Sequence, residues 1–307
     1  MIANFFNNSK PIKIFNIIVL LFLGYVSSIF LKHSVAFSAA FLIKSAALLL
    51  LYILYLMIFK FIVEKNKLTK DNSYALFIGV TLLGIFYEVF FSYEILFSNI
   101  ILLLSFRKIY SLRSAINTKL KLFDAAFWIG ISTLIYTWSI LYLLLIFIGI
   151  IIYRKVNLKN LLIPLIGFAA PIFIYFTYNF YFDKLPLFYS RFDYTINMNF
   201  ITYNSFKFLI PITFLITILL WSIVMVTPKI ISVSNHLKFS WSVLLIHLII
   251  SVVIVVIAPI KNGAEFFYLV FPSAIVITNF LQKSKSATFK NLILYLFLIL
   301  AVSVYFL

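Results

Sequence analysis

The stretch Leu122–Tyr153, LFDAAFWIGISTLIYTWSILYLLLIFIGIIIY, decides how the chain is threaded. It has 32 residues, and Asp124 is its only charged residue. A single straight helix of that length would be about 48 Å long, more than a hydrocarbon core of about 30 Å, and two full crossings need about 40 residues. The stretch therefore predicts two short helices or a re-entrant hairpin.

The basic residues on either side indicate whether the chain returns to its starting side. If it does, and if the N-terminus is cytoplasmic, 19 basic residues lie inside, 5 lie outside and Lys44 lies within a helix. If the stretch crosses once, the count falls to 15 inside and 9 outside. Because Lys and Arg concentrate in cytoplasmic loops, the charges favour a returning hairpin, which places the C-terminus in the periplasm.

The composition of the 307-residue chain excludes a soluble globular protein. Hydrophobic residues make up 64% and charged residues 11%, whereas soluble domains have about 45–50% and about 25%. The net charge of +17 comes from lysines and arginines in short loops between apolar runs, which favours membrane topology over nucleic-acid binding. The chain has no cysteine, so disulfides and thiol catalysis are excluded.

Further apolar runs bring the total to about eleven predicted membrane segments in one domain, 1–307. The fold class is therefore an all-α, polytopic integral membrane protein. The first run resembles a signal peptide, but it is long and has no clear cleavage site, so we expect an uncleaved helix. The runs are 14–31, 38–62, 74–92, 95–106, 160–182, 206–227, 239–258, 265–281 and 290–307.

Residues 107–121 predict an interfacial helix that lies on the cytoplasmic leaflet. Four apolar residues recur there at helical spacing, namely Ile109, Leu112, Ile116 and Leu120. They lie opposite five basic side chains. A helix with one apolar and one basic face is typical of a segment lying in the membrane interface.

Glu88 stands out among the acids because it lies one turn inside the outer end of run 74–92. An ionisable group at that depth is costly unless it is paired or faces a wet cavity. Lys44, at similar depth in run 38–62, is a candidate partner. The other interpretation is a general base or cation site that faces a cavity in the outer leaflet, and both stay open.

Two further ionisable residues lie in or at the start of apolar runs. Glu265 follows an Asn-Gly turn and begins run 265–281, where an acid complements the helix dipole; the same position also suits a ligand site at the membrane surface. His247 lies in the middle of its run, which predicts a neutral imidazole bonded to another helix, with a proton relay as the alternative.

Small and polar residues begin the hairpin. Asp124 is expected to cap the helix start or to pair with Lys119 or Lys121. Four residues permit close helix contact there: Gly130, Ser132, Thr133 and Ser139. The sequence contains no phosphate-binding glycine loop and no HExxH, CxxC, GxSxG or DxD motif, and its three histidines are scattered, so it predicts neither a metal site nor a cofactor.

Three stretches, together with the start Met1–Lys13, resemble an uncharacterised family of multi-pass inner-membrane proteins from flavobacteria and relatives. They are DAAFWIGIS from Asp124, RKVNLKNLLIPLIGFAAP from Arg154 and KNGAEFFYLVFP from Lys261. The resemblance covers nearly the whole chain. It implies a multi-pass protein of the bacterial inner membrane and carries no assigned activity.

The order of short spans, basic cytoplasmic segment and hairpin is also similar to that of the C-type multi-spanning glycosyltransferases, which use polyprenyl-phosphate sugars. Those enzymes have an essential acid in the first outer loop, and residues 32–37 here contain none. The resemblance implies that Glu88 or Glu94 supplies the catalytic base and that Arg191 or Lys44 meets the phosphate. The missing acid equally favours a non-catalytic relative.

These observations predict an inner-membrane protein of cell-envelope assembly, either a non-catalytic subunit or a degenerate relative of lipid-linked-sugar enzymes. A polyprenyl-phosphate-sugar-dependent glycosyltransferase is the first alternative, and a small-solute or lipid transporter is the second, so enzymatic activity stays open. The expected partners are membrane lipids, a polyprenyl-phosphate-linked substrate and other membrane subunits, with no nucleic acid. Candidate catalytic residues are Glu88 and Glu94, and candidate substrate-binding residues are Lys44, Arg191 and Glu265.

Overall fold

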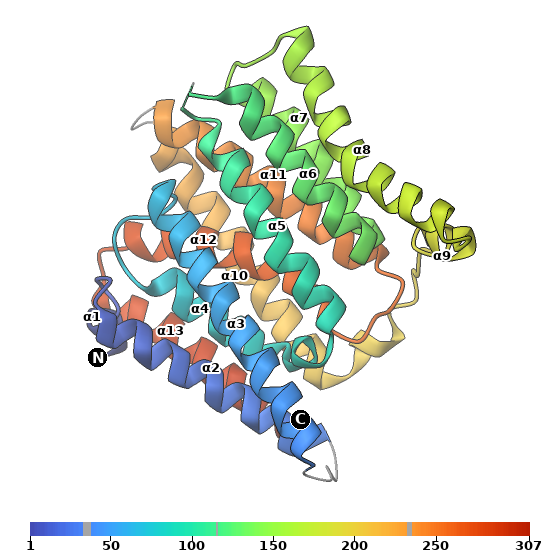
Figure 1. Ribbon diagram of the computed structural model, residues 1–307. Helices are drawn as coiled ribbons and strands as arrows, with labels where there is room; N and C mark the ends of the chain where they lie inside the picture. The colour runs from blue at the N-terminus through green and yellow to red at the C-terminus, as the bar shows by residue number, and fades with distance from the viewer. Residues whose placement is uncertain (33–37, 115, 232–234) are drawn as a thin grey trace. The chain divides into compact units, whose positions relative to one another are not determined.

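A computed structural model describes residues 1–32, 38–114, 116–231 and 235–307, and within these ranges every regular element is a helix (Figure 1). The all-α class is thus confirmed. Contacts divide the chain into two compact units. Unit 1 comprises Met1–Leu96, Asn199–Ser232 and Lys261–Leu307, and unit 2 comprises Phe97–Met198 and Val233–Ile260. That residues 1–307 act as a single domain stays a prediction.

Unit 1 is built around two buried helices. Every residue of α4 is buried, and α12 packs against both α4 and α10. A helix that is hydrophobic all round belongs in an interior, and α2 and α13 complete the packing around α4. The elements of unit 1 are α1 (Ile2–Phe5), α2 (Pro11–Lys32), α3 (Ala39–Lys65), α4 (Tyr74–Ile85), η1 (Tyr87–Phe91), η3 (Ile201–Asn204), α10 (Phe206–Ile231), η4 (Ala264–Phe266), α12 (Phe267–Lys283) and α13 (Ala287–Ser303).

Unit 2 is a bundle in which α6 packs along α8, and α7 packs against α11. Its elements are α5 (Tyr93–Ser111), which starts in unit 1, α6 (Thr118–Ile135), η2 (Thr137–Leu141), α7 (Tyr142–Ile152), α8 (Leu158–Tyr181), α9 (Leu185–Tyr189) and α11 (Asn235–Ile257). Two glycines allow α6 and α8 to approach closely. Gly130 lies against Pro171 and the Phe168 carbonyl, and Gly167 lies against the Phe123 carbonyl.

The stretch 122–153 folds as two helices and not as one straight helix. The chain leaves helical geometry at Tyr136 (φ −137°, ψ 107°), passes through η2 and continues as α7, which packs against α6. Three hydroxyls hold this turn, with oxygen–oxygen distances of 2.8–3.0 Å among Ser98, Ser132 and Ser139. The predicted division of this stretch into two helices is thus confirmed, as is the predicted role of Gly130 in close packing.

The predicted interfacial helix at 107–121 is wrong. Its first residues are the last turn of α5 and its last residues are the first turn of α6. Asn117, directly before α6, is left-handed (φ 50°). The ends are tied together, because Lys121 Nζ donates to the Ser111 carbonyl at 2.8 Å and Lys108 Nζ lies 2.6 Å from Asp124 Oδ2. Asp124 therefore pairs with Lys108, and not with the predicted Lys119 or Lys121.

Replacing Asp124 by asparagine should destabilise the protein only modestly. The Lys108 and Asp124 side chains are 28% and 27% exposed, and solvent-exposed ion pairs contribute about 1 kcal/mol or less. We expect the melting temperature to fall by about 2–4 °C. Asp183→Asn, which removes the same charge from an exposed loop position, is the control and should leave the melting temperature unchanged; equal shifts in both variants would contradict the prediction.

Six helices among the described residues are long and apolar enough to cross a membrane: Pro11–Leu31, Ala39–Lys65, Leu158–Tyr181, Phe206–Ile230, Leu237–Ile257 and Ala264–Lys283. These helices indicate a membrane protein. The total of about eleven segments stays a prediction, because shorter apolar helices such as α4 and α13 do not reach the length of a full crossing. The kind of membrane and the orientation of the termini likewise stay predictions.

Candidate functional site

Glu88 lies in unit 1, at a break in the helix of the predicted segment 74–92. Helix α4 ends at Ile85, Phe86 adopts φ −99° and ψ 56°, and the next residues tighten into the 3₁₀ helix η1. The phenol of Tyr52 donates to the Val89 carbonyl at 2.7 Å, which satisfies an acceptor within η1. Glu88 therefore lies in a short turn that packs against η4, and not inside a continuous membrane helix.

Glu88 is paired with a lysine that the sequence analysis did not name. Lys207 Nζ, from the first turn of α10, lies 3.0 Å from Glu88 Oε1. Both side chains are largely buried, with 22% of Lys207 and 16% of Glu88 exposed. The ammonium also lies 4.2 Å from the centre of the Tyr87 ring, where cation–π attraction adds to the ion pair. A lysine held in this way can exchange a carboxylate oxygen for a phosphate oxygen.

Tyr87 connects this ion pair to Tyr305, which lies just after the C-terminal end of α13. The Tyr87 and Tyr305 rings stack with centres 5.0 Å apart. The Tyr305 hydroxyl donates to the Gly24 carbonyl at 3.1 Å. Tyr305 and Gly24 both line a pocket, so the stacked tyrosines join the polar pair to the pocket wall.

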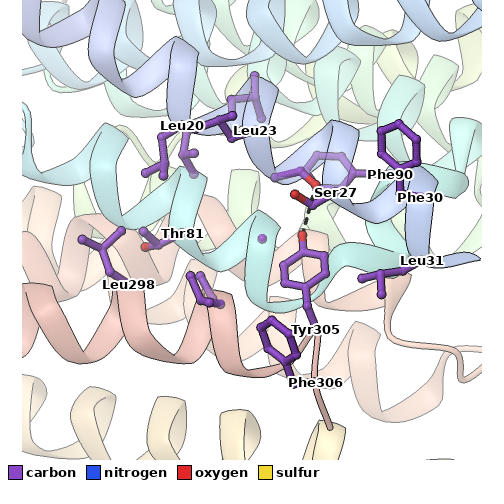
Figure 2. Close-up of a pocket in the computed structure, with 16 residues that line it drawn as sticks. Leu20, Leu23, Ser27, Phe30, Leu31, Thr81, Phe90, Leu298, Tyr305 and Phe306 are labelled. Carbon is purple, nitrogen blue, oxygen red and sulfur yellow. Dashed lines mark hydrogen bonds between the residues drawn. The ribbon is translucent and has the colours of Figure 1, made fainter.

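The pocket has a volume of about 470 Å³ and lies between α2, α4 and α13. Its wall is apolar, with leucine and phenylalanine side chains around the cavity in Figure 2. The Thr81 hydroxyl in this wall donates back to the Ile78 carbonyl of its own helix at 2.9 Å, which leaves the wall less polar still. At the rim, Leu23, Phe30 and Phe306 are 55%, 66% and 86% exposed, so the pocket is bordered by apolar side chains that face outward.

Glu265 is fully buried and its hydrogen-bond partners lie within the chain. The backbone N–H of Gly263 donates to both carboxylate oxygens at 3.0 and 3.2 Å, and the hydroxyl of Tyr203 donates to Oε1. Gly263 is left-handed (φ 98°), as the predicted Asn-Gly turn requires. Glu265 thus closes this turn and ties it to η3.

The other candidate residues, Lys44, Glu94 and Arg191, are all exposed. Lys44 is exposed on α3, with its ammonium 5.7 Å from the centre of the Tyr93 ring. Glu94 is exposed in the first turn of α5. Arg191 belongs to unit 2, where its side chain is exposed and its carbonyl accepts a hydrogen bond from Thr137 Oγ1 at 2.9 Å.

His247 occupies the core of unit 2. Its Nδ1 lies 3.0 Å from the hydroxyl of Tyr110, which confirms the predicted bond to another helix. The imidazole also packs 4.1 Å from the Phe106 ring, centre to centre. Among the described residues, no three His, Asp or Glu side chains come together in a way that could hold a metal ion.

The sequence analysis missed the residues that connect the ion pair to the pocket, above all Lys207 and Tyr305. Lys207 lies at the start of the predicted run 206–227, and that position alone did not indicate which acid of the other segments it would meet. Tyr305 carried no signal either, because tyrosine is common in this chain (19 residues) and aromatic residues are frequent at the ends of membrane segments.

The comparisons with known proteins identify a family and no activity. The sequence model of the Family of unknown function (DUF6427) matches residues 7–307. Neither the curated proteins nor the solved structures contain a significant match. Since the matched region spans almost the whole chain, from the start of the first long helix to the last residue, the protein belongs to DUF6427, a family of unknown function.

Proposed function

We propose that the protein binds a lipid-linked substrate in unit 1 and serves cell-envelope assembly in the bacterial inner membrane. The observation that carries the proposal is the apolar pocket joined to the Glu88–Lys207 pair through Tyr87 and Tyr305. A lipid-linked substrate has the same two parts, a hydrocarbon chain and a phosphate-bearing headgroup.

The pocket supports the hydrocarbon part of this assignment. Its volume of about 470 Å³ falls within the range of about 300–1,000 Å³ that is typical of small-molecule sites. Exposed apolar residues at its rim, such as Phe30 and Phe306, would face lipid tails in a membrane. A single isoprenoid or acyl chain can therefore enter from the bilayer without crossing water.

The Glu88–Lys207 pair supports the headgroup part. In the unliganded state the carboxylate neutralises the ammonium, which avoids an isolated charge in a partly buried position. An incoming phosphate would bind Lys207 and displace Glu88, whose carboxylate would then be available to a hydroxyl or a cation of the headgroup. In the proposed subunit role these groups only hold the substrate for another protein.

Glycosyl transfer from a polyprenyl-phosphate sugar is the catalytic alternative, and the exposed carboxylate of Glu94 favours it, because Glu94 is open to a ligand. Replacing Glu94 by glutamine, alone and together with Glu88→Gln, tests this alternative by complementation of a strain that lacks the gene. Full complementation by the double variant would rule out a catalytic base at these positions and leave the subunit role.

Native mass spectrometry of the full chain, extracted in mild detergent from its own membrane, tests the proposal. We expect a retained lipid of defined mass with a long chain and a phosphate. Ala301→Phe fills the pocket from α13 and should lower retention by about tenfold, as expected for steric changes in an apolar site.

Ala47→Phe is the matched control, since it makes the same change at an exposed position of α3 outside the pocket. The control should retain the lipid as the wild type does. A protein that carries no lipid of defined mass, or whose lipid is retained equally by Ala301→Phe, would overturn the proposal.

A further inference from the structure

A second hollow, with different chemistry, lies in unit 2 where α6 starts and α7 connects to α8. It has a volume of about 690 Å³ and is lined by three cationic side chains and three amides. These are Lys119, Arg154 and Lys155, with Asn117, Asn157 and Asn160. None of the described residues that line it is acidic.

The loop that carries two of these cations is held in place by hydrogen bonds. Asn160 is 5% exposed, and its Nδ2 donates to the Lys155 carbonyl at 2.7 Å, while its backbone N–H donates to Asn157 Oδ1 at 2.7 Å. Arg154 is left-handed (φ 55°), and its guanidinium carbon lies 5.7 Å from the centre of the Phe239 ring on α11. These hydrogen bonds and the ring contact hold the loop that carries Arg154 and Lys155 in one conformation.

The segments around the hollow contain many more basic than acidic residues. Residues 107–121 and 154–160 carry eight basic residues, and the nearest acid in the sequence, Asp124, is already paired with Lys108. Burial lowers the pKa of Lys121, and the neighbouring Lys108 and Lys155 lower it further. Crowding of like charges costs free energy that a bound anion would recover.

Apolar side chains surround the hollow and indicate where the anion comes from. Leu120 and Val156 line it and are 58% and 59% exposed, and Leu158 next to it is 72% exposed. A soluble phosphate has no apolar part that could contact these side chains, whereas a lipid has acyl chains close to its phosphate. Basic pockets bordered by apolar surface at one end of a helix bundle are typical sites for anionic lipid headgroups.

We propose that this hollow binds the phosphate of an anionic phospholipid headgroup, with the amides of Asn117 and Asn157 hydrogen-bonded to the headgroup and Leu120 and Val156 against the first methylenes of its chains. The site lies in unit 2 and uses none of the residues assigned to the pocket of unit 1. It therefore stands or falls independently of the function proposed above.

Lipid titration of the purified, delipidated full chain, followed by native mass spectrometry, tests the site. The probes are phosphatidylglycerol and phosphatidylcholine with identical acyl chains. We expect tighter binding of phosphatidylglycerol, which Arg154→Asn with Lys155→Gln weakens by about 25-fold, since each cation near a headgroup contributes about fivefold. Asparagine is chosen at position 154 because it tolerates left-handed geometry.

Two further variants distinguish loss of this binding site from misfolding of the loop and from a general loss of positive charge. Lys119→Gln changes an exposed residue on α6 and leaves the loop 153–158 intact, so it should weaken phosphatidylglycerol binding by about fivefold without affecting the fold. Lys283→Gln with Lys285→Gln removes two charges from unit 1 and should have no effect.

Unchanged phosphatidylglycerol binding in the variants at 119, 154 and 155 would overturn the proposal. So would equal loss in the control at 283 and 285, because binding would then follow net charge and not this hollow. Displacement of the lipid by millimolar inorganic phosphate, with equally tight binding of glycerol phosphate, would assign the hollow to a soluble anion instead and would also overturn it.

Discussion

Replacing Gly167 by alanine should lower the melting temperature of the protein by about 2–12 °C. A Cβ atom at this position would lie 2.6 Å from the Phe123 carbonyl oxygen and 3.2 Å from the Ala126 Cβ of α6. The first of these is a backbone atom, so the clash can be relieved only if α6 and α8 move apart. Overpacking of this kind costs about 1–3 kcal/mol, and each kcal/mol lowers the melting temperature of a protein of this size by about 2–4 °C.

Unfolding can be followed by tryptophan fluorescence, to which Trp128 in α6 and Trp138 in η2 contribute. Gly149→Ala is the matched control, because a Cβ on Gly149 would meet only side-chain atoms, at 3.7 and 3.8 Å. That variant should keep or slightly raise the melting temperature, since alanine is the better helix former. Equal losses at positions 149 and 167 would contradict the close contact.

Replacing Lys207 by methionine should cost more stability than replacing Glu88 by glutamine. The first change takes the Lys207 ammonium away from the Glu88 carboxylate, which is 16% exposed, and removing one partner of a buried ion pair costs about 3–5 kcal/mol. The second change leaves the ammonium over the Tyr87 ring, which continues to attract it. The free energy of unfolding, measured by thermal or chemical denaturation in detergent, should separate the two variants.

The double variant, Glu88→Gln with Lys207→Met, completes a mutant cycle. It leaves no charge behind, so most of the stability lost in Lys207→Met should return. Glu64→Gln breaks the Lys60–Glu64 pair on α3, where the carboxylate side chain is 46% exposed, and should change the free energy of unfolding by less than about 0.5 kcal/mol. Strictly additive losses in the double variant would show that the two side chains do not interact.

The positions of helices could be predicted from the sequence because they depend on local runs of apolar residues. Each predicted run has a helix in the described structure, and the length of 122–153 correctly indicated two helices in place of one. Where helices end inside a run could not be predicted in the same way. Phe86 ends α4 in an uninterrupted apolar stretch, and the break is stabilised by Tyr52, which lies on another helix.

The partner of Glu88 could not be predicted for a related reason. Lys44 was named because it lies in the adjacent segment of the sequence, whereas Lys207 comes 119 residues after Glu88. The prediction of an interfacial helix at 107–121 was wrong because the same pattern of basic and apolar residues occurs in helices on a membrane surface and in the ends of two consecutive helices. Only the tertiary bonds of Lys108 and Lys121 decide between them.

The short, wholly buried helix α4 has a consequence for how the protein is made. Its 12 residues span about 18 Å, too little to insert into a bilayer as an independent segment during synthesis. The helices that enclose it include α12 and α13, which lie about 190 residues further along the chain. During translation α4 therefore lacks part of its packing partners until α12 has left the ribosome. In this interval α4 is accessible to a membrane chaperone or a quality-control protease.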